Sequence, residues 1–173
     1  MKLKKLEGDN KNKNYIKNIY CFNIMKRISS WHSSKLLTTS SFFFTIPGIY
    51  SYVYFNLIYS PALLLTTSLI SANFWRDALD DWRRHLDLVF SKLSFSYFVG
   101  MTLYHVPWKL NLFIALPNLG LMSYCYNKSA IEHEKNNKSW KYWHLGFHSL
   151  MMGQLFITMT YVGKNYLQIK NKK

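Results

Sequence analysis

LLTTSSFFFTIPGIYSYVYFNLIYSPALLLTTSLISANFW, residues 36–75, is a stretch of sequence without a single Lys, Arg, Asp or Glu. A helix on the surface of a soluble protein usually carries charged side chains on its outer face. An uncharged, mostly apolar stretch of about 18 residues or more is instead typical of a bilayer span. This stretch is long enough for two spans, and Ser60-Pro61 indicates the turn between them, because proline fits the first turn of a helix and disfavours helix just before it.

Three further stretches also lack charged side chains, at 93–108, 110–127 and 142–163. The sequence therefore predicts an all-α protein, a multi-pass transmembrane helical bundle in residues 36–163. Pro117 lies inside the fourth predicted span and predicts a kink there. The five predicted spans are 41–59, 61–75, 87–105, 110–126 and 142–163.

The excess of basic residues is concentrated outside the predicted spans. The chain has 22 Lys and Arg against 8 Asp and Glu, a net charge of +14, and residues 1–35 form a basic N-terminal arm. Beside a membrane, such an arm is an orientation signal and an anchor to anionic lipid, so membrane lipids are the expected partners. Binding to nucleic acid is the alternative that charge alone allows. The arm has no arginine cluster and no recognisable module, so no specific nucleic-acid binding is predicted.

Two parts of the arm differ in composition. Residues 1–14 are rich in Asn and Lys and are predicted to be disordered. Residues 15–31 are loosely amphipathic, which fits either a segment lying in the membrane interface or an arm that packs on nothing. The sequence does not decide between these two interpretations.

The distribution of Lys and Arg predicts the orientation of the bundle. With the N-terminus in the cytoplasm, the polar loops 76–86 and 127–141 are also cytoplasmic, and the two connections on the other side carry little charge besides Lys109. The basic tail 164–173 then lies on the opposite side and is an exception to the rule.

The loop 76–86 contains three arginines that allow two interpretations. Their guanidinium groups can bind lipid headgroup phosphates, or they can pair with the carboxylates of the same loop. We favour the second interpretation. The arginines are Arg76, Arg83 and Arg84, and the carboxylates belong to Asp77, Asp80 and Asp81.

Two histidines lie in the fifth predicted span, His144 and His148. A spacing of four residues places both imidazoles on one face of a helix, which suits two ligands of one zinc ion. Ionisable residues inside a span are costly and indicate function. The alternative is a pair of neutral histidines hydrogen-bonded between helices.

Two more polar residues are expected near these histidines. Ser71 lies close to the cytoplasmic end of the second predicted span, and Asp87 opens the third at the same membrane face. Because the fifth span begins at that face, the sequence predicts that Ser71, Asp87 and both histidines converge and point into the bundle.

A serine near the end of the second helix, an aspartate opening the third and a His-x-x-x-His early in the last helix resemble the superfamily of alkaline ceramidases, adiponectin-type receptors and hemolysin III-like proteins. The resemblance implies that Ser71, Asp87, His144 and His148 surround a zinc ion that activates water for amide hydrolysis in lipids. Asp87 would orient or deprotonate that water, and Ser71 would hydrogen-bond the developing oxyanion.

The chain departs from this family in two ways. Trp75 occupies the position, four residues after Ser71, where the family has its first histidine. The family has seven helices, whereas this sequence predicts five. A third zinc ligand would have to come from Asp87 itself or from His85.

The sequence is therefore consistent with two functions. The first is a divergent zinc-dependent lipid amide hydrolase, or a relative that has lost catalysis. The second is a non-enzymatic membrane protein such as a scaffold, a receptor-like bundle or a transporter-associated subunit. The missing histidine and the short chain favour the second, whereas the expected convergence of Ser71, Asp87, His144 and His148 favours the first.

Overall fold

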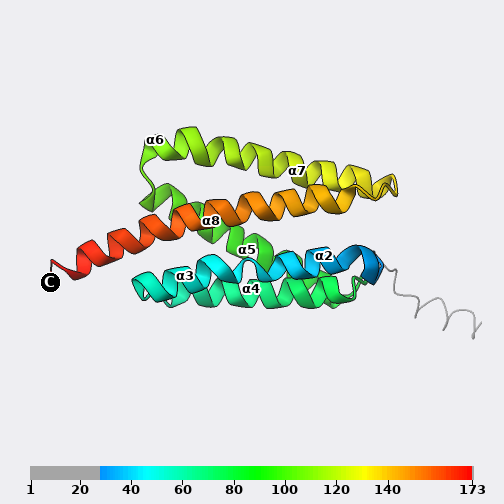
Figure 1. Cartoon of the computed structure of the whole chain (residues 1–173), viewed down its shortest axis with the longest axis horizontal. Coiled ribbons are helices and arrows are strands. Elements are labelled where there is room, and N and C mark those ends of the chain that lie inside the picture. Colours follow the sequence, from blue (N-terminus) through cyan, green and yellow to red (C-terminus); the bar gives the residue numbers. More distant parts are fainter. Residues whose placement is uncertain (1–27, 173) are drawn as a thin grey trace, which may run out of the picture.

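The computed structural model describes residues 28–172, and this part of the chain is built from helices joined by short connections (Figure 1). The expectations for residues 1–27 of the arm lie outside the described residues. The helices are α2 (Trp31–Phe42), α3 (Thr45–Phe55), α4 (Tyr59–Arg76), α5 (Trp82–His105), α6 (Trp108–Leu110), the π-helical η1 (Asn111–Ala115), α7 (Leu116–Glu134) and α8 (Trp140–Lys170).

The first predicted span is not one continuous helix. It starts earlier, at Trp31, and is divided into α2 and α3 by a tight turn at residues 43–44. Pro47 explains the division, because it has no N–H to donate to the carbonyl of Phe43. That carbonyl instead accepts a hydrogen bond of 3.1 Å from the N–H of Ile46.

The turn to the second helix comes earlier than Ser60-Pro61. Asn56 adopts a left-handed conformation, with φ of 54°, at the end of α3. The following helix, α4, already begins at Tyr59, so Pro61 lies inside its first turn, where a missing N–H costs nothing.

The two polar loops are shorter than predicted because side chains extend the helices into them. The Asp81 carboxylate accepts a hydrogen bond from the N–H of Arg83 and so begins α5 at Trp82. At the other loop, Glu132 near the end of α7 binds Lys128, Asn137 and Ser139. These bonds lower the pKa of Glu132 below its usual value, and the bond with Lys128 has the largest effect.

A π-helical turn precedes Pro117, where the sequence predicts a kink. Residues Asn111–Ala115 form η1 immediately before the helix that contains Pro117. The side chain of Asn111 donates hydrogen bonds to the carbonyls of Thr102 and Val106, at 3.4 and 3.0 Å. It thereby closes the end of α5 and fixes the connection between the two helices.

In the arrangement of the helices, α8 is central (Figure 1). It packs against α2, α3, α5 and α7, while α4 packs against α2, α3 and α5. Two apolar clusters lie along this assembly. One contains Phe44, Leu64, Phe98, Leu155, Met159 and Val162, and the other contains Leu37, Phe74, Trp75, Ala78 and Trp140.

The polarity of the bundle is unusual, because hydroxyl groups fill much of its interior while large apolar side chains cover its surface. Buried hydroxyl side chains are found in α2, α3, α4, α5, α7 and α8. Several join neighbouring helices, as Thr102 does with Thr158 at 2.7 Å. Exposed apolar side chains include Phe43, Ile49, Val53, Leu65, Leu93, Phe113 and Leu121.

By length and hydropathy, α5 is the one helix in residues 28–172 that qualifies as a candidate membrane span. Its most apolar window has a mean hydropathy of 1.2, and 22% of that window is buried. The other four predicted spans correspond to helical segments but do not meet this criterion.

Gly163 lies at a close contact between α8 and the Phe55 ring of α3, and its replacement by alanine is expected to be destabilising. An added Cβ would lie within 2.6 Å of three atoms of the Phe55 ring, so the helices would have to separate. We expect Gly163→Ala to cost about 1–3 kcal/mol and to lower the melting temperature in detergent. Gly153→Ala, on an exposed part of the same helix with nothing within 4 Å, is the matched control and should not lower it. Equal melting temperatures for the two variants would contradict this packing.

Candidate functional site

The predicted site residues lie toward the end of the bundle formed by the end of α4 and the starts of α5 and α8. Ser71, Asp87 and His148 are buried, and His144 is half-buried. The side chains therefore face the interior, as the sequence predicts. In the structure these side chains form two groups. Neighbouring residues of α2 hydrogen-bond to each group and so connect them.

The first group joins α4 and α5. The Asp87 carboxyl accepts a hydrogen bond of 3.4 Å from the Ser91 hydroxyl, and the Ser71 hydroxyl also interacts with it. Ser71 in turn accepts a hydrogen bond of 3.2 Å from Ser41 on α2. The backbone carbonyl of Ser41 also accepts a bond from Ser68. These contacts satisfy a carboxyl that is almost completely removed from the surface.

The second group is formed by the two histidines on α8. Nδ1 of His148 lies 2.8 Å from the Ser40 hydroxyl, and the Phe44 ring packs edge-on against the same imidazole at 4.9 Å. The His144 and His148 ring centroids are 4.9 Å apart. Nδ1 of His144 lies 3.5 Å from the hydroxyl of Ser129 on α7.

The Ser40–His148 contact can be satisfied without any reaction. The Ser40 hydroxyl also lies 3.0 Å from the carbonyl of Leu37 and can donate to it. The N–H of a neutral imidazole can then donate to the Ser40 oxygen. Both side chains are paired in this arrangement, which joins α2 to α8.

Trp75 occupies space beside His144. Its ring centroid lies 5.2 Å from that of His144, in an edge-on contact, and it also packs against Trp140 at 6.1 Å. The position four residues after Ser71 therefore does face the histidine pair. An indole fills it with a large apolar ring that offers no metal ligand.

The side chains of residues 28–172 do not provide the expected zinc shell. Within this range, no three His, Cys, Asp or Glu side chains are grouped closely enough to hold a metal ion. His144, His148 and Asp87 are therefore not grouped closely enough to share an ion in this structure, and His85 is exposed at the surface of α5. Zinc binding stays a prediction. Two imidazoles without a third protein ligand do not fit the three-ligand pattern of catalytic zinc sites.

The arginines of the first polar loop are largely committed to ion pairs. Arg83 binds Asp81 at 2.8 Å and Asp77 at 3.5 Å, and Arg84 binds Asp80 at 2.7 Å. Arg76 is exposed at the end of α4. These pairs are those of the favoured interpretation, in which the loop neutralises its own charges. Binding of headgroup phosphate by these arginines stays a prediction.

Several residues that contact the site were not predicted from the sequence, among them Ser40, Ser41, Ser91 and Ser129. A serine in an apolar segment has no distinctive spacing and is common in helix contacts. For Ser40 and Ser41, the available signal was a polar pair in the middle of an uncharged stretch. Their partners depend on the packing of α2 against α4 and α8.

Comparisons of the chain with protein family models, with curated proteins and with solved structures find no match.

The Ser40–His148 bond is expected to stabilise the packing of α2 on α8. Ser40→Ala leaves a buried imidazole without its partner, which costs about 1–3 kcal/mol when nothing replaces it. The variant should therefore melt at a lower temperature in detergent. Ser149→Ala is the matched control, since Ser149 is exposed and bonds the Leu145 carbonyl of its own helix. The interaction would be refuted if a double-mutant cycle of Ser40→Ala with His148→Leu gave no coupling.

Proposed function

We propose that this chain is a multi-pass integral membrane protein in which hydroxyl and imidazole groups join the helices of a non-enzymatic bundle. Its class would be that of a scaffold, a receptor-like bundle or a transporter-associated subunit. The observation that carries the proposal is the polarity of the bundle. A surface of large apolar side chains suits hydrocarbon, and small hydroxyl residues between helices are typical of packing inside a membrane.

The low hydropathy of the other helices has a physical explanation. Ser60, Ser68 and Ser71 lower the average for α4, yet all three are buried against other helices and would not contact lipid. Their hydroxyls bond within the bundle, so the cost of placing them in a membrane is small. Hydropathy averaged along a helix counts both faces and underestimates the apolar character of the outer one.

The helix lengths also suit a bilayer. With 18 residues, α4 is about 27 Å long, and α5 with 24 residues is about 36 Å. The hydrocarbon core of a bilayer is about 30 Å thick. Helical segments of these lengths reach across it with their ends near the headgroups.

Exposed Trp and Tyr side chains occur at both ends of the bundle, where the headgroup regions would lie. Trp31, Trp82 and Tyr142 stand at the starts of α2, α5 and α8, and all three are more than half exposed. Tyr59 at the start of α4 and Tyr104 and Trp108 around the end of α5 are exposed at the opposite end. Such belts of amphipathic rings are typical of the two membrane interfaces.

Five crossings place the two ends of the chain on opposite sides, with the α7–α8 connection on the cytoplasmic side. This topology is tested in a variant whose two natural cysteines, Cys21 and Cys125, are replaced by serine. A single cysteine is then introduced in that variant, either as Lys138→Cys or as Lys172→Cys. In sealed vesicles with the cytoplasmic face outward, an impermeant maleimide should label Lys138→Cys and not Lys172→Cys until detergent is added.

Glycosylation provides an independent control of the orientation. Asn127-Lys128-Ser129 and Asn137-Lys138-Ser139 are acceptor sequences, and a cytoplasmic location keeps both unmodified in microsomes. Modification of either, or labelling of both cysteines from the same side, would overturn the proposed crossings. Release of the protein by alkaline carbonate would overturn membrane integration itself.

A divergent zinc-dependent lipid amide hydrolase is the second candidate. Two observations favour it: Ser71 and Asp87 are in contact, and the position of the family's missing histidine, Trp75, faces His144. Ring centroids of two histidines that share a tetrahedral zinc are about 5 Å apart, given Zn–N bonds of about 2.0–2.1 Å. The distances from His144 to Trp75 and to His148 are close to this value.

Trp75→His is therefore expected to create a three-histidine zinc site if the resemblance extends to the arrangement of these helices. The purified variant should retain about one zinc per chain and melt at a higher temperature with zinc than without it. The natural chain is the control for metal content, and Trp75→His with His144→Ala should lose the metal again. A variant that folds and retains no more zinc than the natural chain would remove the support for this candidate.

A further inference from the structure

The acidic side chains of residues 28–172 are confined to one end of the bundle, where basic side chains accompany them, whereas the other end carries basic side chains alone. The described Asp and Glu residues all lie at one end, in the α4–α5 loop, the first turns of α5 and the last turn of α7: Asp77, Asp80, Asp81, Asp87, Glu132 and Glu134. The opposite end, where α3 and α5 finish, carries Lys109, Lys164, Lys170 and Lys172. No carboxylate side chain of residues 28–172 is therefore available to neutralise these lysines.

The last part of α8 continues beyond the helices that support it. Phe55 at the end of α3 packs against Gly163, and His105 at the end of α5 contacts Asn165 at 3.2 Å. All described residues from Tyr166 onward are exposed. Figure 1 shows this segment projecting past the ends of α3 and α4.

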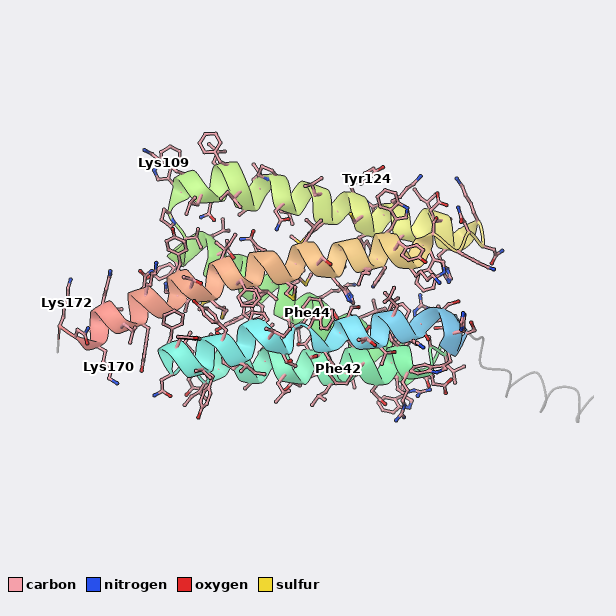
Figure 2. All side chains as sticks on the ribbon, viewed as in Figure 1. Phe42, Phe44, Lys109, Tyr124, Lys170 and Lys172 are labelled. Carbon is pink, nitrogen blue, oxygen red and sulfur yellow. The ribbon has the colours of Figure 1, made fainter. Side chains whose placement is uncertain are left out.

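The projecting segment mixes lysines with apolar side chains. Tyr166, Leu167 and Ile169 are exposed between Lys164 and Lys170. Two lysines at this end also lie near aromatic rings, Lys109 at 6.0 Å from Trp108 and Lys164 at 5.9 Å from Tyr161. Figure 2 shows Lys109, Lys170 and Lys172 at the same end of the molecule.

We propose that Lys109, Lys164, Lys170 and Lys172, here called the C-terminal basic surface, bind the headgroup phosphates of anionic phospholipids. The proposal rests on the proposed crossing of a membrane. With 31 residues, α8 is about 46 Å long, so it passes beyond a hydrocarbon core of about 30 Å into the headgroup layer. Anionic lipid in the leaflet at that end would attract these lysines electrostatically, and their alkyl stems would lie along apolar groups while the ammonium reaches phosphate.

This assignment favours lipid over an acidic protein as the partner. The lysines are interleaved with apolar and aromatic side chains at the depth where the helix leaves the hydrocarbon, an arrangement typical of interfacial anchors. Binding to anionic lipid also accounts for the position of the basic tail. Lys and Arg usually gather on the cytoplasmic side of a membrane protein, and this tail lies on the other side. These lysines would bind headgroups of the leaflet at that end and would not determine the orientation of the chain in the membrane.

The experiment measures lipid selectivity of the full chain in detergent. Thermal unfolding is followed during titration with short-chain phosphatidylglycerol, with short-chain phosphatidylcholine and with inorganic phosphate. We expect phosphatidylglycerol to stabilise the chain at concentrations at least tenfold lower than phosphatidylcholine. In Lys164→Gln/Lys170→Gln/Lys172→Gln this preference should fall at least fivefold, since a single lysine near an anionic surface already contributes about a factor of five, and the basic arm should retain the rest of the preference.

The matched control removes the same charge at the other end, with Lys135→Gln/Lys138→Gln/Lys141→Gln. It should keep most of the preference, and Lys164→Arg/Lys170→Arg/Lys172→Arg should retain it fully. Equal losses in the two glutamine variants would show a general effect of net charge and overturn the proposal. Stabilisation by inorganic phosphate as strong as by phosphatidylglycerol would overturn lipid as the ligand.

Carbonate extraction of each variant from membranes separates the two proposals. A chain that stays in the membrane pellet but shows no lipid preference contradicts the C-terminal basic surface alone. A chain released by carbonate contradicts the membrane crossing on which that surface depends.

Discussion

Hydrogen bonding between helices is the interaction on which this structure depends. Inside the bundle there is no bulk water to satisfy a polar side chain, so each buried hydroxyl, imidazole or carboxyl is stabilised by a partner within the protein. The pairs Thr67–Ser94, Thr102–Thr158 and Ser40–His148 each join two helices. Small side chains at these contacts also let the backbones approach closely. The apolar clusters fill the space that remains between them.

The order and approximate extent of the helices could be predicted from the sequence because charges are excluded from long stretches. The exact helix boundaries could not be predicted, because they depend on single backbone groups. Pro47 divides the first segment through one missing N–H, and Asp81 begins α5 several residues before the apolar stretch. Glu132 similarly orders the α7–α8 connection through three partners. A pattern of apolar residues contains no information about such local bonds.

For the candidate site, the sequence indicated which faces meet but not what each side chain touches. Ser71 and Asp87 are in contact, and the two histidines share one face of α8, as their spacings require. The partner of His148 is Ser40, which comes from a segment that the sequence assigned only to a generic span. Trp75 shows most clearly what the sequence could not predict. The resemblance implies a metal ligand at this position, whereas the indole packs as an apolar ring against His144.

The position of α7 has a consequence for local unfolding. It packs mainly against α8, whereas α4 and α8 each contact three or more other helices (Figure 1). Its polar connections to α8 are few: Asn118 with the Leu150 carbonyl and Gln154, and Ser129 with Trp140 and His144. Separating α7 breaks one helix interface, while separating α4 breaks three. The amides of α7 should therefore exchange with deuterium through a cooperative opening of lower free energy than those of α4.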